Sequence, residues 1–495
     1  MIDNISWVVA YPEILLLIMA CVIALVDLGV RTPLRNATYG LTLTTLAGLA
    51  VLLAFYADTG RTVTGFGGMV VTDPMGAWLK CFATIALMAT LVYGRGYSAD
   101  RDMLRGGELF TLSMFALLGI YVMISGHHFL VIYLGLEMLT LSSYALVALR
   151  RDDELAVEAA MKYFVLGALA SGFLLYGMSM LYGATGSLDI AEVAKMVSQG
   201  VEDKKILLLG VVFIVAGLAF KIGAVPFHMW IPDIYHGAPT VVTLLVGGAP
   251  KLAAFAIVVR LLVEGLLPVA ADWQQMLAMM AVASLVVGNL AAIAQTNLKR
   301  MLAFSTISQM GFVLLAFVSG TQGGDAGNAV NAYSAGMFYT ISYVLTTLAS
   351  FGVILLLAQK GFESESISDL AGLNQRSPGV AAIMGLCMFS LAGIPPLVGF
   401  YAKLAVLQGL VATGSPAMLK LAVLAVVMSL IGAFYYLRVV KVMYFDAPSD
   451  DAQPVSPSAD VHVVLSLNGL AILALGIMPG GLMTLCANAM SALMR

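Results

Sequence analysis

The chain has 495 residues, of which 61% are hydrophobic and 11% are charged, and its mean hydropathy is +0.96. Soluble domains carry about 25% charged residues, so these values exclude a soluble globular protein and indicate a polytopic membrane protein. The formal net charge of −3 gives no case for nucleic-acid binding.

A helix needs about 20 apolar residues to cross the hydrocarbon core of a bilayer. Applied along the chain, this length predicts fourteen transmembrane segments, at about 12–29, 39–57, 75–95, 108–125, 127–149, 159–183, 206–235, 239–267, 273–296, 300–319, 329–358, 379–412, 417–445 and 461–488. The connections between them are mostly short, and the longer ones are polar. The prediction is therefore an all-α membrane protein with no inserted soluble domain.

The distribution of lysine and arginine predicts the orientation, because these residues are in excess in cytoplasmic loops. Fourteen of them lie in one set of loops and flanks: Arg31, Arg35, Arg95, Arg101, Arg105, Arg150, Arg151, Lys162, Lys299, Arg300, Lys360, Arg376, Arg438 and Lys441. Six lie in the other set: Arg61, Lys195, Lys204, Lys205, Lys420 and Arg495. The first set should face the cytoplasm, which puts both termini on the periplasmic side.

Segments seven and twelve, 206–235 and 379–412, are longer than a simple span requires, and both contain proline at mid-depth. Proline has no backbone N–H and cannot continue the hydrogen-bond ladder of a helix. The interruptions should therefore free the carbonyl groups of Ile222, Leu391 and Ala392. Paired interrupted helices in corresponding positions are typical of repeated transporter halves with an ion site at the midplane, whereas a packing kink is the alternative for either one alone.

Lysines stand close to both predicted breaks, at depths where a charge is costly. Lys221 and Lys403 lie within about two turns of a break, and Lys251 lies in the next predicted span. Glu137 is a carboxylate at comparable depth in segment five. Ionisable residues inside a membrane are expensive unless a partner or a water-filled path receives them, so we interpret these four as a proton relay.

Three stretches of the sequence carry a resemblance to a known family: YLGLEMLTLSSYALVALRRDDELAVEAAMKYFVLGALASGFLLYGMSMLYGATGSLDI, FKIGAVPFHMWIPDIYHGAPT and NLKRMLAFSTISQMGF. Together they resemble the subunit N family of the bacterial proton-pumping NADH:quinone oxidoreductase, respiratory complex I, whose mitochondrial counterpart is subunit 2. The resemblance covers essentially the whole chain. Lys403, where the related subunit M has a glutamate, and the expected lack of a long C-terminal extension favour subunit N over its antiporter-like relatives.

The resemblance implies an antiporter-like fold with two inverted five-helix repeats and with helices seven and twelve broken. The expected organisation is helices one to three in 1–107, a first repeat of helices four to eight in 108–267, a second repeat of helices nine to thirteen in 268–445, and a polar loop with helix fourteen in 446–495.

The resemblance also assigns roles to individual residues. It places Glu137, Lys221, Lys251 and Lys403 in the relay, and Glu158 with Lys162 in a second acid–base pair. The spacing of that pair, i to i+4, independently puts both side chains on one helical face, where an ordinary surface ion pair is an equal alternative.

Two histidines lie near the end of helix seven, and imidazole can pass protons near neutral pH. His228 falls where the family has a histidine, and His236 is open to two interpretations, placement at the membrane interface or proton transfer. The sequence departs from the family at Gln309, where many relatives have histidine, and at Val241 and Pro250, which leave the geometry of helix eight undecided.

The resemblance implies a proton-translocating, non-redox membrane subunit, with protons passing from the cytoplasm to Lys221, through water and Lys251, and out by Lys403. Flavin, iron–sulfur clusters and quinone are expected in partner subunits, because this chain has neither a GxGxxG fingerprint nor a cysteine cluster. The expected partners are other membrane subunits, including antiporter-like ones, and lipid, in the bacterial inner membrane. The alternatives are a subunit of a multisubunit cation/proton antiporter and a structural scaffold.

Overall fold

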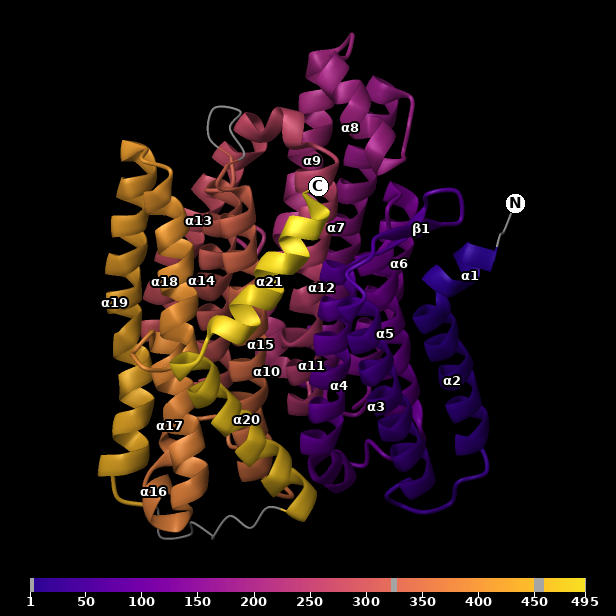
Figure 1. The fold of residues 1–495 in the computed structure, drawn as a ribbon. Coiled ribbons are helices and arrows are strands. Elements are labelled where there is room, and N and C mark those ends of the chain that lie inside the picture. The colour runs from indigo at the N-terminus through magenta and orange to yellow at the C-terminus, as the bar shows by residue number, and fades with distance from the viewer. Residues whose placement is uncertain (1–3, 322–326, 449–457, 495) are drawn as a thin grey trace.

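The computed structural model describes residues 4–321, 327–448 and 458–494, and most of its helices run between the same two ends of the molecule (Figure 1). The α-helices are α1 Asn4–Val9, α2 Tyr11–Asp27, α3 Asn36–Asp58, α4 Pro74–Asp100, α5 Glu108–Ser125, α6 Phe129–Val147, α7 Glu154–Thr185, α8 Ile190–Gln199, α9 Lys204–Ile222, α10 Trp230–Gly237, α11 Thr240–Gly247, α12 Ala249–Val258, α13 Ala270–Ile293, α14 Leu298–Val318, α15 Ala329–Leu357, α16 Leu373–Arg376, α17 Pro378–Ala392, α18 Val398–Ala412, α19 Pro416–Phe445, α20 Ala459–Ile477 and α21 Gly480–Leu493. A π-helical turn, η1 Val259–Glu264, continues α12, and two 3₁₀ turns are η2 Leu267–Val269 and η3 Ile367–Leu370.

The polytopic helical fold predicted from the sequence is confirmed. Within the described ranges, twelve helices are long and apolar enough to cross a membrane by length and composition. The count of fourteen spans and the inverted repeats stay predictions, because α2 has 17 residues and α17 and α18 have 15 each. Part of the polar loop predicted in 446–495, and Arg495, lie outside the described residues.

Helix starts are specified locally by short acidic and amide side chains. The side chains of Asp73, Asp153, Asp189, Asp203 and Asn297 each accept a hydrogen bond from a backbone N–H in the first turn of the helix that follows. This N-cap interaction satisfies donors that have no partner within the helix, and it is worth about 1 kcal/mol. The helices that position the functional side chains therefore begin at fixed residues.

Within the described residues, a bend at Gly248 divides the predicted segment 239–267 into α11 and α12, and three further breaks interrupt long apolar segments. The two expected ones separate α9 from α10 and α17 from α18. The third was not predicted: the segment expected at 461–488 is divided into α20 and α21, with Pro479 at the division. In Figure 1 both pieces lie obliquely across the front of the bundle, and both contact α15.

Two further elements lie outside the predicted segments. The antiparallel hairpin of β1 Val63–Gly65 and β2 Val70–Thr72 connects α3 to α4. The short helix α8 lies at the end of the bundle opposite α16 and connects α7 to α9 (Figure 1). Both are too short or too polar to span a bilayer, so a search for apolar runs could not find them.

Three segments form the centre of the helix bundle: the segment from α11 to η1, α14 and α15. In the 18 most apolar consecutive residues of each of these three segments, 94%, 94% and 89% of the residues are buried. The corresponding share for α19 is 17%. The central helices are therefore surrounded by protein, whereas α19 presents an apolar surface suited to lipid or to another subunit. Cys81, Cys387 and Cys486 are buried, whereas Cys21 is exposed on α2.

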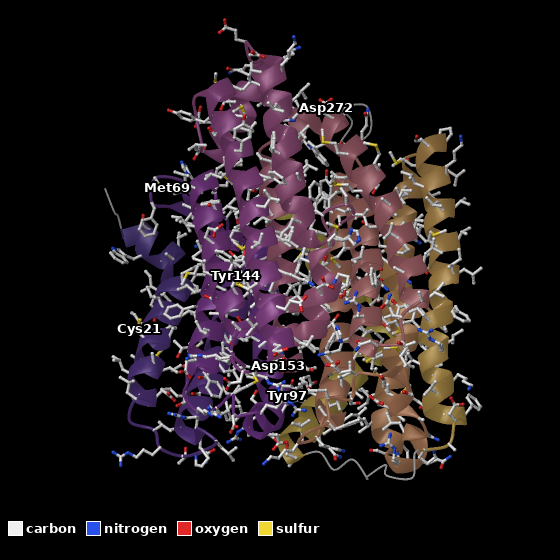
Figure 2. The ribbon with its side chains drawn as sticks, turned by 180° about the vertical axis from the view of Figure 1, so that it is seen from behind. Cys21, Met69, Tyr97, Tyr144, Asp153 and Asp272 are labelled. Carbon is white, nitrogen blue, oxygen red and sulfur yellow. The ribbon has the colours of Figure 1, made fainter. Side chains whose placement is uncertain are left out.

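The two ends of the bundle differ in the residues they carry. Tyr97 and Asp153 lie towards one end and Asp272 lies at the other (Figure 2). The first end also holds α16 and the positions predicted to be cytoplasmic around Arg101 and Arg150. We call it the α16 end.

Candidate functional site

At the first broken helix, a buried lysine binds a carbonyl group that the break frees. α9 ends at Ile222, where Gly223 adopts a positive φ of 87° that favours glycine. Pro226 offers no N–H to the carbonyl of Ile222. Lys251 on α12, which is 2% exposed, donates from Nζ to this carbonyl oxygen over 2.8 Å. The carbonyl freed by proline was predicted, and its partner was not.

The second broken helix repeats this arrangement with more contacts. α17 ends at Ala392, followed by Gly393, again with a φ of 87°. Lys403 on α18 donates from Nζ to the carbonyl oxygens of Leu391 at 2.8 Å and Ala392 at 3.0 Å, and to Ser429 Oγ at 2.9 Å. All three ammonium donors are thus used, and the carbonyl end of a helix favours a positive charge.

At the level of contacts, Lys403 therefore corresponds to Lys251 and not to Lys221. Both Lys251 and Lys403 bind the last carbonyl groups of a half-helix that ends in a glycine with positive φ. The sequence associates the first break with Lys221, which lies nearest to it along the chain, whereas in the structure the freed carbonyl of Ile222 binds Lys251.

Lys221 differs from the other two because its ammonium group is buried without a hydrogen-bond partner among the described residues. It lines a closed cavity of about 20 Å³ together with Thr140 of α6, Tyr163 of α7 and Lys251. That volume is room for about one water molecule, and the lining is polar enough to bind it. Lys221 and Lys251 therefore share one small, hydratable space.

Glu137 on α6 faces the same region without forming an ion pair with Lys221. No contact within 4 Å joins the two side chains in the described part of the chain, and Glu137 Oε1 is buried without a hydrogen bond. The carboxylate still acts on the Lys221 ammonium through space. Glu137 and Lys221 are therefore two opposite charges that attract each other without direct contact.

Gln309 occupies a fully bonded position beside the second break. Its Nε2 donates to the carbonyl of Leu391 at 3.1 Å and to Tyr436 Oη at 3.0 Å, and Tyr339 donates its hydroxyl to Gln309 Oε1. Tyr436 Oη in turn lies 2.5 Å from Ser305 Oγ. An amide does not titrate, so this position supplies fixed hydrogen bonds next to Lys403 and not a proton-accepting group.

The Glu158–Lys162 pair lies at the surface. Lys162 Nζ is 2.8 Å from Glu158 Oε1 and 3.1 Å from Asp233 Oδ2, with side chains 44% and 60% exposed for Lys162 and Glu158. These residues line an open cavity of about 170 Å³. The contacts agree with the alternative of an ordinary surface ion pair, which in general contributes little to stability.

The two histidines have different surroundings. His228 lies in the first break, partly buried, and its Nδ1 has no hydrogen bond among the described residues. His236, in the last turn of α10, has Nε2 at 3.5 Å from Glu365 Oε2, in the segment between α15 and η3. His236 also lines the 170 Å³ cavity. The structure thus gives His236 a carboxylate neighbour that the sequence did not reveal.

Several buried ion pairs were missed by the sequence interpretation. Lys80 Nζ lies 2.5 Å from Glu13 Oε1, and Lys299 Nζ lies 2.6 Å from Glu365 Oε1. Arg260, which is fully buried, is held by Asp73 at 2.7 Å and Glu264 at 3.0 Å. Glu13, Lys80, Arg260 and Glu264 all lie within predicted spans, so the same rule that identified Lys221 could have found them.

A known protein family matches more than half of the chain. The family described as "NADH:quinone oxidoreductase/Mrp antiporter, TM" matches residues 126–430. NADH-quinone oxidoreductase subunit N of Polaromonas naphthalenivorans (strain CJ2) is 68% identical over 494 residues, covering 100% of this chain and 99% of the relative.

Two solved structures share the fold. A chain of respiratory complex I from Thermus thermophilus with bound aureothin has a TM-score of 0.80 and 31% identity, over 96% of this chain and 99% of that chain. A chain of the Mrp complex from Dietzia sp. DQ12-45-1b has a TM-score of 0.83 and 20% identity, over 98% and 97% of the two chains. The second similarity concerns the fold alone.

Proposed function

The chain belongs to the family of NADH-quinone oxidoreductase subunits N, and from this premise we propose that it carries protons through the membrane arm of a bacterial complex I. The chain is a non-redox membrane subunit of a translocase. Its partners are the other membrane subunits of the complex, and its location is the bacterial inner membrane. The observation that carries the proposal is that a buried lysine binds the freed carbonyl groups at each of the two helix breaks.

The relay is built from four residues. Glu137 and Lys221 form its first pair, since the separated carboxylate favours the charged form of the lysine, and any movement between them changes how tightly Lys221 holds its proton. Water in the 20 Å³ cavity connects Lys221 to Lys251. Lys403 is the last lysine of the row, and from it the proton leaves the chain. Glu158, Lys162, His228 and His236 support uptake from the cytoplasm.

A charged lysine at a break is held by carbonyl dipoles, whereas a neutral amine has only two N–H donors and a weaker attraction to them. Proton transfer to or from Lys403 therefore changes the strength of its contacts with Leu391 and Ala392. Movements in partner subunits that strain or relax a broken helix would act on proton affinity through the same contacts. This is how we expect quinone reduction elsewhere in the complex to drive the relay.

We expect redox cofactors only in the partner subunits. Among the described residues, no group of three or more histidine, cysteine or acidic side chains is arranged to hold a metal ion. An affinity-tagged form of the chain, isolated from bacterial membranes, should copurify with subunits that carry flavin and iron–sulfur clusters and should show NADH:quinone reductase activity. The chain stripped of its partners should show no flavin absorbance and no NADH oxidation. Bound flavin in the stripped chain would contradict this assignment.

The alternative, a subunit of a cation/proton antiporter, draws on the shared fold of the Mrp complex chain. A sodium site requires several oxygen ligands around the ion. The buried groups of the proposed relay are three lysines and one glutamate, which suit protons better than sodium. Proton uptake that persists without sodium would separate the two functions.

We propose that the α16 end faces the cytoplasm and that both termini are periplasmic. Single cysteines would be introduced by Arg105→Cys, where the side chain is 76% exposed, and Lys195→Cys, where it is 58% exposed. The exposed Cys21 must first be removed by Cys21→Ser. A membrane-impermeant maleimide added from the periplasm should label only the cysteine at 195. External labelling of the cysteine at 105 would overturn the orientation.

A further inference from the structure

A three-residue cluster at the α16 end joins His236 to two residues, Lys299 and Glu365, that the relay described above does not use. Lys299, at the start of α14, is 2% exposed, and its Nζ lies 2.6 Å from Glu365 Oε1. The other carboxylate oxygen of Glu365 lies 3.5 Å from His236 Nε2. On its inner side, Lys299 Nζ is 3.5 Å from Thr240 Oγ1 and from the carbonyl of Ala238. One carboxylate is thus shared by a buried lysine and a partly exposed histidine.

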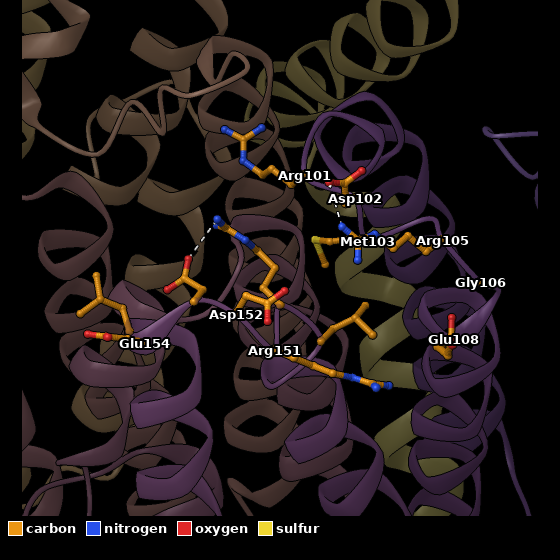
Figure 3. A pocket seen from close by; sticks show the side chains of 13 residues that line it. Arg101, Asp102, Met103, Arg105, Gly106, Glu108, Arg151, Asp152 and Glu154 are labelled. Carbon is orange, nitrogen blue, oxygen red and sulfur yellow. Dashed lines mark hydrogen bonds and ion pairs between the residues drawn. The ribbon is translucent and has the colours of Figure 1, made fainter.

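The cluster lies between water-accessible space and the closed interior. His236, Lys299 and Glu365 line an open cavity of about 260 Å³, and His236 also lines the neighbouring 170 Å³ cavity. Arg150 and Asp153 border both the 260 Å³ cavity and a third, of about 670 Å³, which Figure 3 shows with charged side chains around it. We call these three cavities the vestibule. The side chains of His236 and Glu365 are 33% and 26% exposed, against 2% for Lys299, so water in the vestibule meets them first.

Backbone hydrogen bonds hold the segment around Glu365 in place, in addition to the hydrogen bond that Asn297 Nδ2 donates to Glu365 Oε2 at 3.3 Å. Leu298 N donates to the carbonyl of Glu365 at 2.6 Å, and Ile367 N donates to the carbonyl of Thr296 at 3.0 Å. A capping box between Ser366 and Asp369 fixes the turn that follows. Because the backbone already anchors this segment, the ion pair with Lys299 calls for another explanation.

We propose that His236, Glu365 and Lys299 form the site at which protons from the cytoplasm are loaded into this chain. The His236 imidazole takes up a proton from vestibule water, and its Nε2 faces Glu365. Glu365 is the shared counter-ion of the imidazolium and the Lys299 ammonium. Lys299 then releases a proton on its inner side, next to Thr240, and regains one from His236 through Glu365, so that one proton enters for each one passed on. This proposal rests on the proton-carrying function proposed above.

The electrostatics make Glu365 the anion of the cluster. Burial alone would raise the pKa of Glu365, but the interaction with His236 and the charge of Lys299 outweigh it and lower the pKa to about 2. Glu365 is therefore an anion at rest in the physiological pH range, and it holds a proton only while passing one from His236 to Lys299. The charged and titratable groups that face His236 and Glu365 from the surrounding elements are Tyr97, Arg150, Asp153, Glu158, Lys162, Asp233, Lys299, Arg300, Glu363 and Asp369.

The test uses assembled complex I in membrane vesicles, with assembly checked by subunit content. Glu365→Gln should lower coupled proton uptake about tenfold or more, the scale of a lost acid–base group. Glu365→Asp should restore part of it. Glu363→Gln is the matched control: Glu363 lies two residues away and pairs with Arg101 at 2.7 Å and Arg150 at 3.2 Å, so its loss disturbs the same segment without touching Lys299. It should keep most of the uptake.

A double variant distinguishes a proton-loading site from an ion pair that only stabilises the structure. Glu365→Gln alone leaves Lys299 buried and unpaired, which is destabilising whatever the function of the pair. Glu365→Gln combined with Lys299→Met removes both charges, and a merely structural pair would then recover wild-type uptake. The loading site predicts that uptake stays low. It also predicts that His236→Gln flattens the pH dependence of uptake between about pH 6 and 8, where imidazole groups titrate.

Three results would overturn the proposal: wild-type uptake in Glu365→Gln, full recovery in the double variant, or an equal loss in Glu363→Gln. Lys221→Ala, measured in the same vesicles, keeps this failure distinct from failure of the proposed function. If Lys221→Ala loses uptake while Glu365→Gln does not, only the loading site is wrong. If neither variant loses uptake, the relay itself is wrong.

Discussion

Lys221→Ala is expected to lower both quinone reduction and proton uptake about tenfold or more in assembled membranes, because it removes the relay's first proton-accepting group. The Lys221 ammonium has no hydrogen-bond partner among the described residues, so its removal leaves no other protein group unsatisfied. Glu137 loses the positive charge that attracts it from Lys221. The two activities should fall together, since redox chemistry and pumping are coupled.

Two further variants at this position test the cause of the loss. Lys221→Met keeps most of the side-chain volume without the charge and should behave like Lys221→Ala, which excludes a cavity effect. Lys221→Arg should rescue poorly, because a guanidinium keeps its proton at any accessible pH. Wild-type pumping by a fully assembled Lys221→Ala complex would rule out the role of this lysine and favour a scaffold function.

Lys403→Ala is expected to abolish most proton uptake while the complex still assembles. The carbonyl of Leu391 keeps its hydrogen bond from Gln309 at 3.1 Å, and the carbonyl of Ala392 keeps Ser429 Oγ at 3.4 Å. Neither carbonyl is left without a donor, which would cost about 1–3 kcal/mol for each. The second break should therefore persist without its charge, and the loss should be one of proton transfer.

Ser429→Ala is the matched control for Lys403→Ala. It removes one hydrogen bond to Lys403 but leaves the charge and two carbonyl contacts, so uptake should fall less than about threefold. Uptake is measured with a pH-sensitive dye in vesicles, and assembly by subunit content. If Lys403→Ala pumps at the Ser429→Ala rate, the ammonium at this break is not part of the path.

The helices could be predicted closely because membrane spans are specified by local composition. The segment expected at 108–125 coincides with α5, and the breaks at Gly223 and Gly393 occur where proline and glycine indicated them. In a bilayer, backbone groups must be satisfied within the helix, so length and hydropathy carry most of the information. The same reasoning identified which carbonyl groups proline would free.

The partners of those carbonyls could not be predicted, because they depend on contacts between helices far apart in sequence. Lys403 lies 12 residues from Leu391, but Gln309 is 82 residues from the same carbonyl. The sequence does not indicate a functional role for Glu365, because this residue lies in a polar connection, where a carboxylate is ordinarily solvated. The packing of the helices brings Glu365 to Lys299. From the sequence alone, Lys299 is placed in the loops and flanks expected to face the cytoplasm.

Lys251 and Lys403 both bind carbonyl groups at helix breaks inside the membrane, and this has an electrical consequence. The sequence predicts both breaks at mid-depth, so we expect a charge that passes between these sites to move largely along the membrane plane and to cross little of the transmembrane voltage. That voltage acts on displacement across the bilayer, with about 2.3 kcal/mol for each elementary charge and 100 mV. The work of pumping against it therefore falls on two steps, the passage from the vestibule to the row of lysines and the departure from its far end.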